Sequence, residues 1–518
     1  MKHVSLNIQK LQIFVAIIIA SGLTLTNASL SASDFTNRSF LNIQDSRDKA
    51  AHRSFVRSLH RAGGDKQTVD DEDNSFTFMI TPQFGKTFGE AEMGKFFGVG
   101  SQNVVPLQYN GDGINQVRQE FMFRFSDNTL PSLNAGDKLT NFNPATVSLN
   151  PRQTSVGAHF DAIIGLAPLA QGLSLSIGTA LLRNKNDVET IFNDGAIIAN
   201  QASTISDYLK GIGQSTVQKA LSFGLLSTNS NEKTQSDDID LRLRYVLVDK
   251  PKSMFGAFIS CRIPTGNEPE AIFLFEPLVG TRHWRFGGGF YGDATINESQ
   301  ASNSTLMVHF DINYQYAFHA NEKRLLDIKN EAWGKYHLSL QAGKPFATVA
   351  NPNVTAIANQ FNPLANVLAQ DMTVYPGSIF TATFMASYNQ GMFACDGGYH
   401  FCFKHAEDNK FKKEWVNNQY YRFISNASWG TAGVNIAVRG VSPDDATNAT
   451  FFQAVNKTDL EINHPSQTFH TLFFTMGILK RDAEYPWTLA LGSEVTVSND
   501  QRAAPYSWDV FGKIGISF

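Results

Sequence analysis

The feature that most restricts the fold is the regular alternation of residues 508–518. This segment reads Trp-Asp-Val-Phe-Gly-Lys-Ile-Gly-Ile-Ser-Phe, so that Trp508, Ile514, Ile516 and Phe518 fall on one face. Side chains of a β-strand point to opposite faces in turn, so the segment has one apolar side and one mostly polar or small side. Its length matches the roughly 9–11 residues that a tilted strand needs to cross a bilayer. The segment therefore predicts a membrane-spanning strand.

Similar alternation recurs from residue 76 onward, and its polar face carries charge. The clearest runs are residues 239–245, 306–318 and 487–497. Charged groups that face lipid cost several kcal/mol, whereas a hydrated bore tolerates them. The polar faces are therefore predicted to line a pore, with Asp240, Arg242, Arg244, His309, Asp311, Glu494 and Lys513 as the pore-lining residues. The arginines either favour the passage of anions or pair with the carboxylates and brace the wall.

Loop lengths give an independent indication of topology. Membrane barrels have short turns on the periplasmic side and longer loops outside. Read backward from Phe518, the chain is expected to form outer loops at 499–507, 441–467, 404–417, 344–376 and 183–236, and short turns at 480–486, 426–431, 389–391, 249–253 and 166–172. A further turn is expected at 319–334, where the connection is longer than this alternation requires. The prediction is an all-β fold, a transmembrane antiparallel up-and-down β-barrel of about 14–16 strands with long outer loops, over residues 75–518.

The insert at 183–236 has a different pattern. Between residues 197 and 224 apolar residues recur at roughly helical spacing, interrupted by Gly211 and Gly213. This periodicity predicts a partly helical loop insert. Such an insert either caps the mouth of the barrel or folds inward and narrows it.

The first 74 residues are expected to lie outside the wall of the barrel. Lys2, His3 and Lys10 precede a short apolar stretch that is followed by small residues, which is the layout of a secretory signal peptide over residues 1–32. A membrane anchor is the alternative, but the apolar stretch is shorter than the roughly 20 residues that a spanning helix requires. The polar segment 33–74 is predicted to form a periplasmic N-terminal arm or a plug inside the barrel.

Composition and motifs exclude several function classes. The formal net charge is −4 and no run of Lys or Arg is present, which gives no indication of nucleic-acid binding. We find no motif for a nucleophile, a phosphate loop or a metal site, so we expect no enzyme, no catalytic residues, no cofactor and no metal. Among three cysteines, Cys395 and Cys402 are close enough in sequence to form a disulfide in an oxidising compartment.

Two groups of residues resemble known barrels. The C-terminal segment that ends on Phe518 is similar to the terminal signature of bacterial outer-membrane β-barrels, in which Trp508, Ile514, Ile516 and Phe518 would form the signal read by the barrel-assembly machinery. Residues 238–245, 255–260, Arg262-Ile-Pro-Thr-Gly266 and 284–289 resemble the strand and loop series of the fatty-acid and aromatic-hydrocarbon transporter barrels. Asn143-Pro-Ala145 is similar to the hatch motif of those transporters, although it lies far from the expected mature N-terminus.

These patterns predict a protein of the bacterial outer membrane, in contact with outer-membrane lipid and with small solutes. The expected function is a porin-like channel for passive passage of small solutes. A transporter of hydrophobic small molecules and a structural or adhesive surface barrel are the alternatives. A homo-oligomer is compatible with the sequence, which does not specify one.

Overall fold

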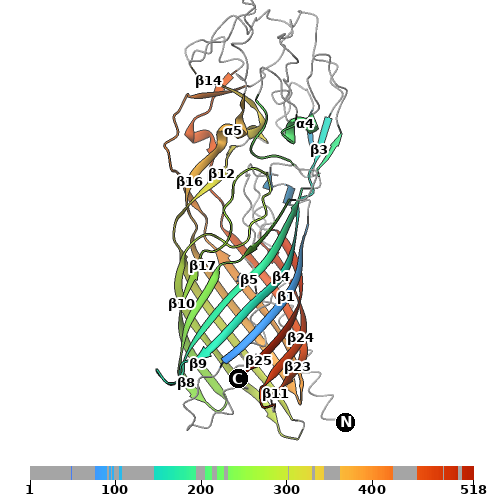
Figure 1. Ribbon diagram of the computed structural model, residues 1–518, viewed down its shortest axis with the longest axis vertical. Helices are drawn as coiled ribbons and strands as arrows, with labels where there is room; N and C mark the ends of the chain where they lie inside the picture. Colours follow the sequence, from blue (N-terminus) through green and yellow to red (C-terminus); the bar gives the residue numbers. More distant parts are fainter. Residues whose placement is uncertain are drawn as a thin grey trace, which may run out of the picture.

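Twelve antiparallel strands of the chain close into a β-barrel (Figure 1). The computed structural model describes residues 48–49, 76–89, 93–94, 96–97, 104–107, 145–188, 190–193, 205–212, 219–226, 231–301, 303–329, 333–342, 362–423, 452–481, 483–499 and 505–518. The barrel strands are β1 (Phe76–Phe88), β4 (Arg152–Gly165), β5 (Leu173–Asp187), β8 (Ile239–Lys250), β9 (Ser253–Ile263), β10 (Arg285–Ser299), β11 (Ser304–Ala317), β17 (Gly377–Gln390), β18 (Phe393–Lys404), β23 (Gln467–Lys480), β24 (Trp487–Ser498) and β25 (Tyr506–Ser517).

The ring closes where β1 pairs with both β4 and β25. At the seam, the Phe76 amide donates to the Phe518 carbonyl at 3.2 Å, and the Phe518 amide donates to the Phe76 carbonyl at 2.7 Å. The Thr77 and Ser517 hydroxyls, 440 positions apart, are hydrogen-bonded at 2.9 Å. Because the ring is closed, none of the twelve strands leaves a free edge, which is the condition for crossing lipid with strands.

Along the barrel strands, side chains alternate between the lipid-facing side and the bore, as the sequence pattern predicts. On β23, Leu472, Phe474 and Met476 lie on the exposed outer side, while Thr471 and Thr475 are fully buried inside. On β25, Ile514 is more than half exposed on the outer side and Lys513 is fully buried; Phe518, which follows the strand, is also more than half exposed. An apolar exterior around a polar interior identifies a transmembrane β-barrel of the outer-membrane type. Among the described residues, no helix is both long and apolar enough to cross a membrane.

The two ends of the barrel differ as expected. One end carries the short connections at 166–172, 251–252, 300–303, 391–392 and 481–486, together with Phe518; the other end carries the long ones. The predicted turns at 166–172, 249–253, 389–391 and 480–486 are therefore confirmed, as is the outer loop at 499–507. By analogy with other barrels, the short turns face the periplasm.

The strand count corrects the prediction of about 14–16. The turn expected at 319–334 instead belongs to a long outer connection between β11 and β17, and the described residues 405–423 and 452–466 belong to one outer connection between β18 and β23. The alternating segments within these connections pair with one another outside the barrel, so they do not add strands to the ring. The turn expected at 426–431 and much of the loops expected at 344–376 and 441–467 lie outside the described residues.

The described parts of these outer connections lie above the barrel and share one hydrophobic core, and we call them the cap (Figure 1). Its sheets are β2–β3–β6, β12–β16–β19, β13–β22 and β15–β14–β20–β21. The cap strands are β2 (Val104–Leu107), β3 (Ala145–Ser148), β6 (Ile191–Asn193), β12 (Ala320–Leu325), β13 (Asp327–Ile328), β14 (Leu338–Gln341), β15 (Asn362–Pro363), β16 (Ala369–Tyr375), β19 (Asp408–Phe411), β20 (Tyr420–Phe423), β21 (Phe452–Ala454) and β22 (Leu460–Glu461). Short helices accompany them: α4 (Ile205–Leu209), α5 (Leu364–Leu368), η4 (Gly334–Tyr336) and η8 (Lys457–Asp459). The strand β7 (Asn231–Ser236) extends β5 at the outer rim.

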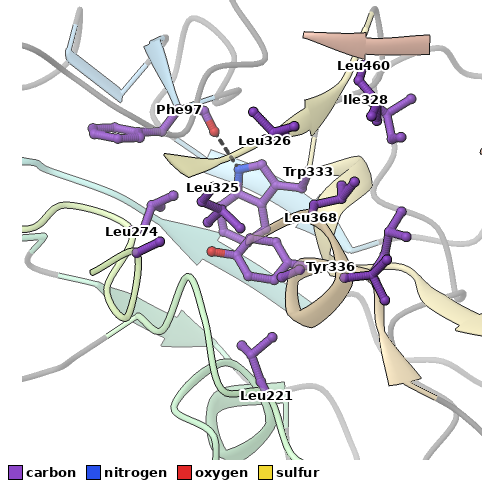
Figure 2. Close-up of a cluster of buried hydrophobic side chains, with 14 of the residues drawn as sticks. Phe97, Leu221, Leu274, Leu325, Leu326, Ile328, Trp333, Tyr336, Leu368 and Leu460 are labelled. Carbon is purple, nitrogen blue, oxygen red and sulfur yellow. Dashed lines mark hydrogen bonds between the residues drawn. The ribbon is translucent and has the colours of Figure 1, made fainter. Parts of the chain in front are cut away.

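The largest hydrophobic core of the described residues lies in this cap and not in the barrel (Figure 2). Trp333 and Tyr336 are fully buried at its centre, in edge contact with ring centroids 5.2 Å apart. The Trp333 indole N–H donates to the Phe97 carbonyl at 2.8 Å, and the Tyr336 hydroxyl donates to the Gly224 carbonyl at 2.6 Å. Five different connections therefore meet in one core, with Phe97, Leu221, Leu274, Leu368 and Leu460 as representatives.

The insert at 183–236 contributes to the cap, with less helix than its periodicity predicts. Only Ile205–Leu209 is helical, and Tyr208, Leu209 and Leu221 pack into the cap core. The helix ends because Gly211 takes a φ of +71°, and a Cβ there would lie 2.6 Å from the Leu221 carbonyl oxygen. The described part of the insert therefore belongs to the cap, and the choice between capping and narrowing the mouth of the barrel stays a prediction. Residues 194–204, 213–218 and 227–230 lie outside the described residues.

Candidate functional site: the charged bore

Every barrel strand sends buried polar side chains into the bore. Two examples from each strand, in chain order, are Thr81 and Gln83, His159 and Asp161, Asn184 and Asn186, Asp240 and Arg242, Ser260 and Arg262, Arg285 and Asp293, His309 and Asn313, Thr381 and Thr383, Asp396 and His400, Thr471 and Thr475, Glu494 and Thr496, and Asp509 and Lys513. Such a lining suits water and polar solutes, because each of these groups would be costly against hydrocarbon.

The structure places all seven predicted residues on the inner face. Five are buried, namely Asp240, Arg242, His309, Glu494 and Lys513, while Arg244 and Asp311 are half-buried. The Arg242 guanidinium donates from Nε to Asp240 Oδ2 at 3.1 Å and lies 3.5 Å, through Nη1, from Asp311 Oδ2. Arg244 lies over the Tyr291 ring, 5.5 Å from its centroid. Arg242 thus has the contacts expected of a bracing residue.

A cluster of basic side chains surrounds one carboxylate near the outer end of the bore. Arg262 lies at the outer end of β9, Arg285 begins β10 and Lys404 ends β18. Asp48 Oδ1 accepts from Arg262 Nη2 at 3.0 Å, and Asp48 Oδ2 lies 3.0 Å from Arg285 Nη1 and 4.0 Å from Lys404 Nζ. We call Arg262, Arg285, Lys404 and the neighbouring His400 the basic cluster.

His400 completes the basic cluster through the backbone. Its Nε2 donates to the Asp48 carbonyl oxygen at 2.6 Å, and its Nδ1 lies 2.8 Å from the Thr383 hydroxyl. His400 and Asp48 are both buried. Side chains from β9, β10 and β18 therefore hold both the side chain and the backbone of Asp48.

The next residue contacts groups of opposite charge. Lys49 Nζ donates to both carboxylate oxygens of Asp509, at 2.9 and 2.7 Å. Lys513 lies four residues after Asp509 on the same inner face, nearer the periplasmic end, and experiences the negative charges of Asp161, Asp396 and Glu494. Asp48 and Lys49 thus each contact side chains of opposite charge on the inner wall of the barrel.

The position of these two residues bears on the segment predicted as arm or plug. Asp48 and Lys49 are the only residues of 33–74 that the structure describes, and both lie inside the barrel. For the segment 33–74 as a whole, the choice between arm and plug stays a prediction. The signal peptide expected at residues 1–32 lies outside the described residues.

The sequence interpretation missed most of the basic cluster. Arg262 could have been found by following the alternation of Phe258, Ser260 and Arg262 to the end of its strand, since all three point inward. Asp48 could not have been found in this way, because it belongs to no periodic segment and its partners are hundreds of residues away in the sequence.

The predicted disulfide is wrong. Both cysteines lie on β18, where Cys402 is buried inside and Cys395 lies on the outer face, and both are free. Seven residues of extended strand separate them by roughly 23 Å, far beyond the roughly 7 Å limit between the Cα atoms of a disulfide. No group of His, Cys, Asp and Glu suited to a metal ion occurs among the described residues.

The Pro-Thr-Gly loop at 264–266, which resembles a loop of the hydrocarbon transporters, is held in place by hydrogen bonds to Asp238. Asp238 Oδ1 accepts from the amides of Thr265 and Gly266 at 3.1 and 3.2 Å, while its Oδ2 accepts from the amide and the hydroxyl of Thr281 at 2.9 and 2.6 Å. Gly266 is required there, because a Cβ would lie 2.1 Å from the Val279 carbonyl oxygen. The Pro-Thr-Gly sequence therefore fixes a rim loop. Of the hatch-like Asn143-Pro-Ala145, the first two residues lie outside the described residues.

An ion-pair network joins the cap to the barrel rim. Glu322 of β12 accepts from His283 Nε2 at 2.9 Å and from Arg324 Nη2 at 2.6 Å, and Arg324 lies 3.6 Å from Glu407. Burial by itself would raise the pKa of Glu322, but the charge of Arg324 and the hydrogen bond from His283 outweigh burial and lower it. The four residues are almost fully buried, so solvent screens this network little.

Acid should loosen this network. A carboxyl with a lowered folded pKa contributes stability above its unfolded pKa, and that stability is lost as the pH falls through the folded value. We expect hydrogen exchange of 320–325 to accelerate below about pH 4.5, near the ordinary pKa of Glu. Glu322→Gln should destabilise the cap at pH 7 by about 1.5–3 kcal/mol and weaken this acid dependence. Glu414→Gln, at an exposed cap position, is the control; equal acid profiles for both variants would contradict the assignment.

Comparisons with known proteins find only solved structures of low sequence identity and low TM-score. No family model matches the sequence, and no curated protein matches it. The solved structures similar to it include an outer membrane channel from Pseudomonas putida F1, at 8% identity and TM-score 0.36, covering 87% of this chain and 99% of that one. The toluene transporter TodX of Pseudomonas putida follows at 6% identity and TM-score 0.30, covering 93% and 96%. The transport unit of the Escherichia coli autotransporter AIDA-I has 8% identity and TM-score 0.28, covering 90% and 97%.

Proposed function

We propose that this barrel is an outer-membrane channel for passive passage of small polar solutes and ions. The observation that carries the proposal is the polar lining contributed by all twelve strands behind an apolar exterior. Solutes that cross such a bore exchange water for fixed hydrogen-bonding groups, which is how protein pores conduct polar species. No catalytic step is part of the proposal.

Size supports small solutes. Barrels of about 8 strands are filled by their own side chains, whereas 16–18 strands leave a wide aqueous channel. A ring of twelve strands lies between these cases. With Asp48, Lys49 and the long side chains of Arg242 and Lys513 buried inside it, the bore suits a narrow path.

The polar lining also separates this proposal from a transporter of hydrophobic molecules. The apolar clusters inside the described barrel are small, such as Met385 with Phe473 and Ile379 with Cys402 and Phe469. The large apolar core lies in the cap, where its members are packed against one another. The described bore therefore offers charged groups along its length and no extended apolar path.

The test is single-channel recording on refolded protein in planar bilayers. We expect stepwise conductance, and Arg244→Gln should lower the preference for anions by removing an inward, half-buried charge. Arg183→Gln is the matched control, because Arg183 lies on the exposed side of β5 and pairs there with Glu232. Absence of steps from correctly folded protein would refute the channel, and uptake of a hydrophobic tracer by the same protein would favour the transporter instead.

A further inference from the structure

We propose that the basic cluster is a binding site for small carboxylates, and that Asp48 occupies it as a tethered carboxylate of the chain itself. The inference rests on the proposed channel function and names a solute class for it. It starts from the geometry: one carboxylate lies within 4.0 Å of three cationic side chains that come from three different strands.

The site is built by the barrel and not by the segment that fills it. Arg262 and Arg285 are register partners on β9 and β10, so the two guanidinium groups lie side by side on the inner wall. Arg262 is also anchored to the wall by Asp240, with 3.8 Å between Nε and Oδ1. Arginine is suited to planar carboxylates because its donors form a rigid fork. The wall residues would therefore keep their places when Asp48 leaves.

Electrostatics favour a replacement anion. Within the described cluster, Arg262, Arg285 and Lys404 carry three positive charges, against which Asp48 and the shared Asp240 supply two negative ones. If Asp48 left, these three cations would each lose a neighbouring carboxylate at positions that are 1–7% exposed. Removing one partner from a buried ion pair is costly. A free carboxylate that enters the bore would remove that cost, whereas a cation would add to it.

Asp48 is also held by contacts that can be broken one at a time. The carbonyl oxygen of Asp48 is bound to His400, its side chain to the arginines, and the adjacent Lys49 to Asp509. None of these contacts is covalent or part of a strand ladder. Exchange between the tethered carboxylate and a free one therefore requires no break in the wall of the barrel.

The experiment compares Asp48→Asn with wild type, using sodium acetate as the probe and sodium chloride at equal ionic strength as its control. Asn keeps the size of Asp and removes the charge. In detergent, acetate should raise the Tm of Asp48→Asn more than that of wild type, whose site is already filled. In bilayers, the anion-to-cation permeability ratio of Asp48→Asn should rise about three- to tenfold over wild type.

Two further variants keep the result specific. Arg183→Gln removes an exposed charge on the outer side of β5 and leaves Asp48 and the basic cluster in place, so its response to acetate should stay close to that of wild type. Asp48→Asn with Arg285→Gln removes a cation of the site and should lose the acetate effect. Correct folding of each variant is checked by heat-dependent migration in gels.

Each outcome decides the matter. Equal acetate protection of wild type and Asp48→Asn, or protection that persists when Arg285 is also replaced, would overturn the carboxylate site. Altered permeability without acetate protection would overturn it as well, because Asp48 would then act only as a fixed charge. If no variant conducts but acetate still protects Asp48→Asn, the binding site stands and the channel function fails.

Discussion

Replacing Trp333 with alanine should unfold the cap while the barrel stays closed. Trp333 is fully buried, contacts Tyr336 and donates its indole N–H to the Phe97 carbonyl. Removing a buried tryptophan typically costs about 3–5 kcal/mol, and the lost hydrogen bond adds to this. A small unit built from long connections has little stability to spare, so we expect the cap to lose its cooperative structure.

Limited proteolysis with mass spectrometry would check this result. Cleavage should appear within 320–341 and 362–375 in the variant, whereas the barrel strands stay protected and the heat-dependent gel shift persists. Val416→Ala is the control, because Val416 lies in the cap and is 57% exposed. If the Trp333 variant is cleaved no faster than this control, the cap core does not hold the outer connections together.

Replacing Leu491 with arginine should destabilise the barrel in lipid. Leu491 lies at the middle of β24 on the outer face, is 72% exposed and faces lipid. An arginine on the lipid side near the bilayer midplane costs about 2–4 kcal/mol. The urea midpoint of unfolding in vesicles, followed by tryptophan fluorescence, should fall accordingly.

Position on the barrel sets this cost, which gives two controls. Leu491→Ile keeps the surface apolar and should change the midpoint little. Tyr485→Arg places the same charge in a turn at the periplasmic end, where Tyr485 is 49% exposed, and should cost about 0–1 kcal/mol. An equal loss at both positions would mean that the outer face of β24 does not contact hydrocarbon.

The parts of the fold that could be predicted from the sequence are those with a strict local period. The inner and outer faces of β8, β11, β24 and β25 follow directly from alternation, because one register assigns every side chain. The short turns could be predicted for a similar reason, since a tight connection between two long strands leaves few alternatives. For these elements the physical cause lies within about ten to fifteen residues.

The strand number and the cap could not be predicted in this way. Alternation indicates only a β-strand with two different faces. The strands β12 and β16 also have two different faces, but they pair in a small sheet outside the membrane. Whether a ribbon joins the ring depends on partners far away in sequence. The same holds for the candidate site: Arg262 follows from its strand, but Asp48 meets it only through the closed barrel.

The seam between β1 and β25 has a consequence for biogenesis. The two strands of the seam, β1 and β25, are the first and the last barrel strands to be synthesised. The barrel therefore cannot close until all twelve strands have been made. An interrupted product would expose two ribbon edges to hydrocarbon, where nothing replaces the missing partners. A chain that ends before β25 therefore cannot close the barrel, whatever else acts on it during assembly.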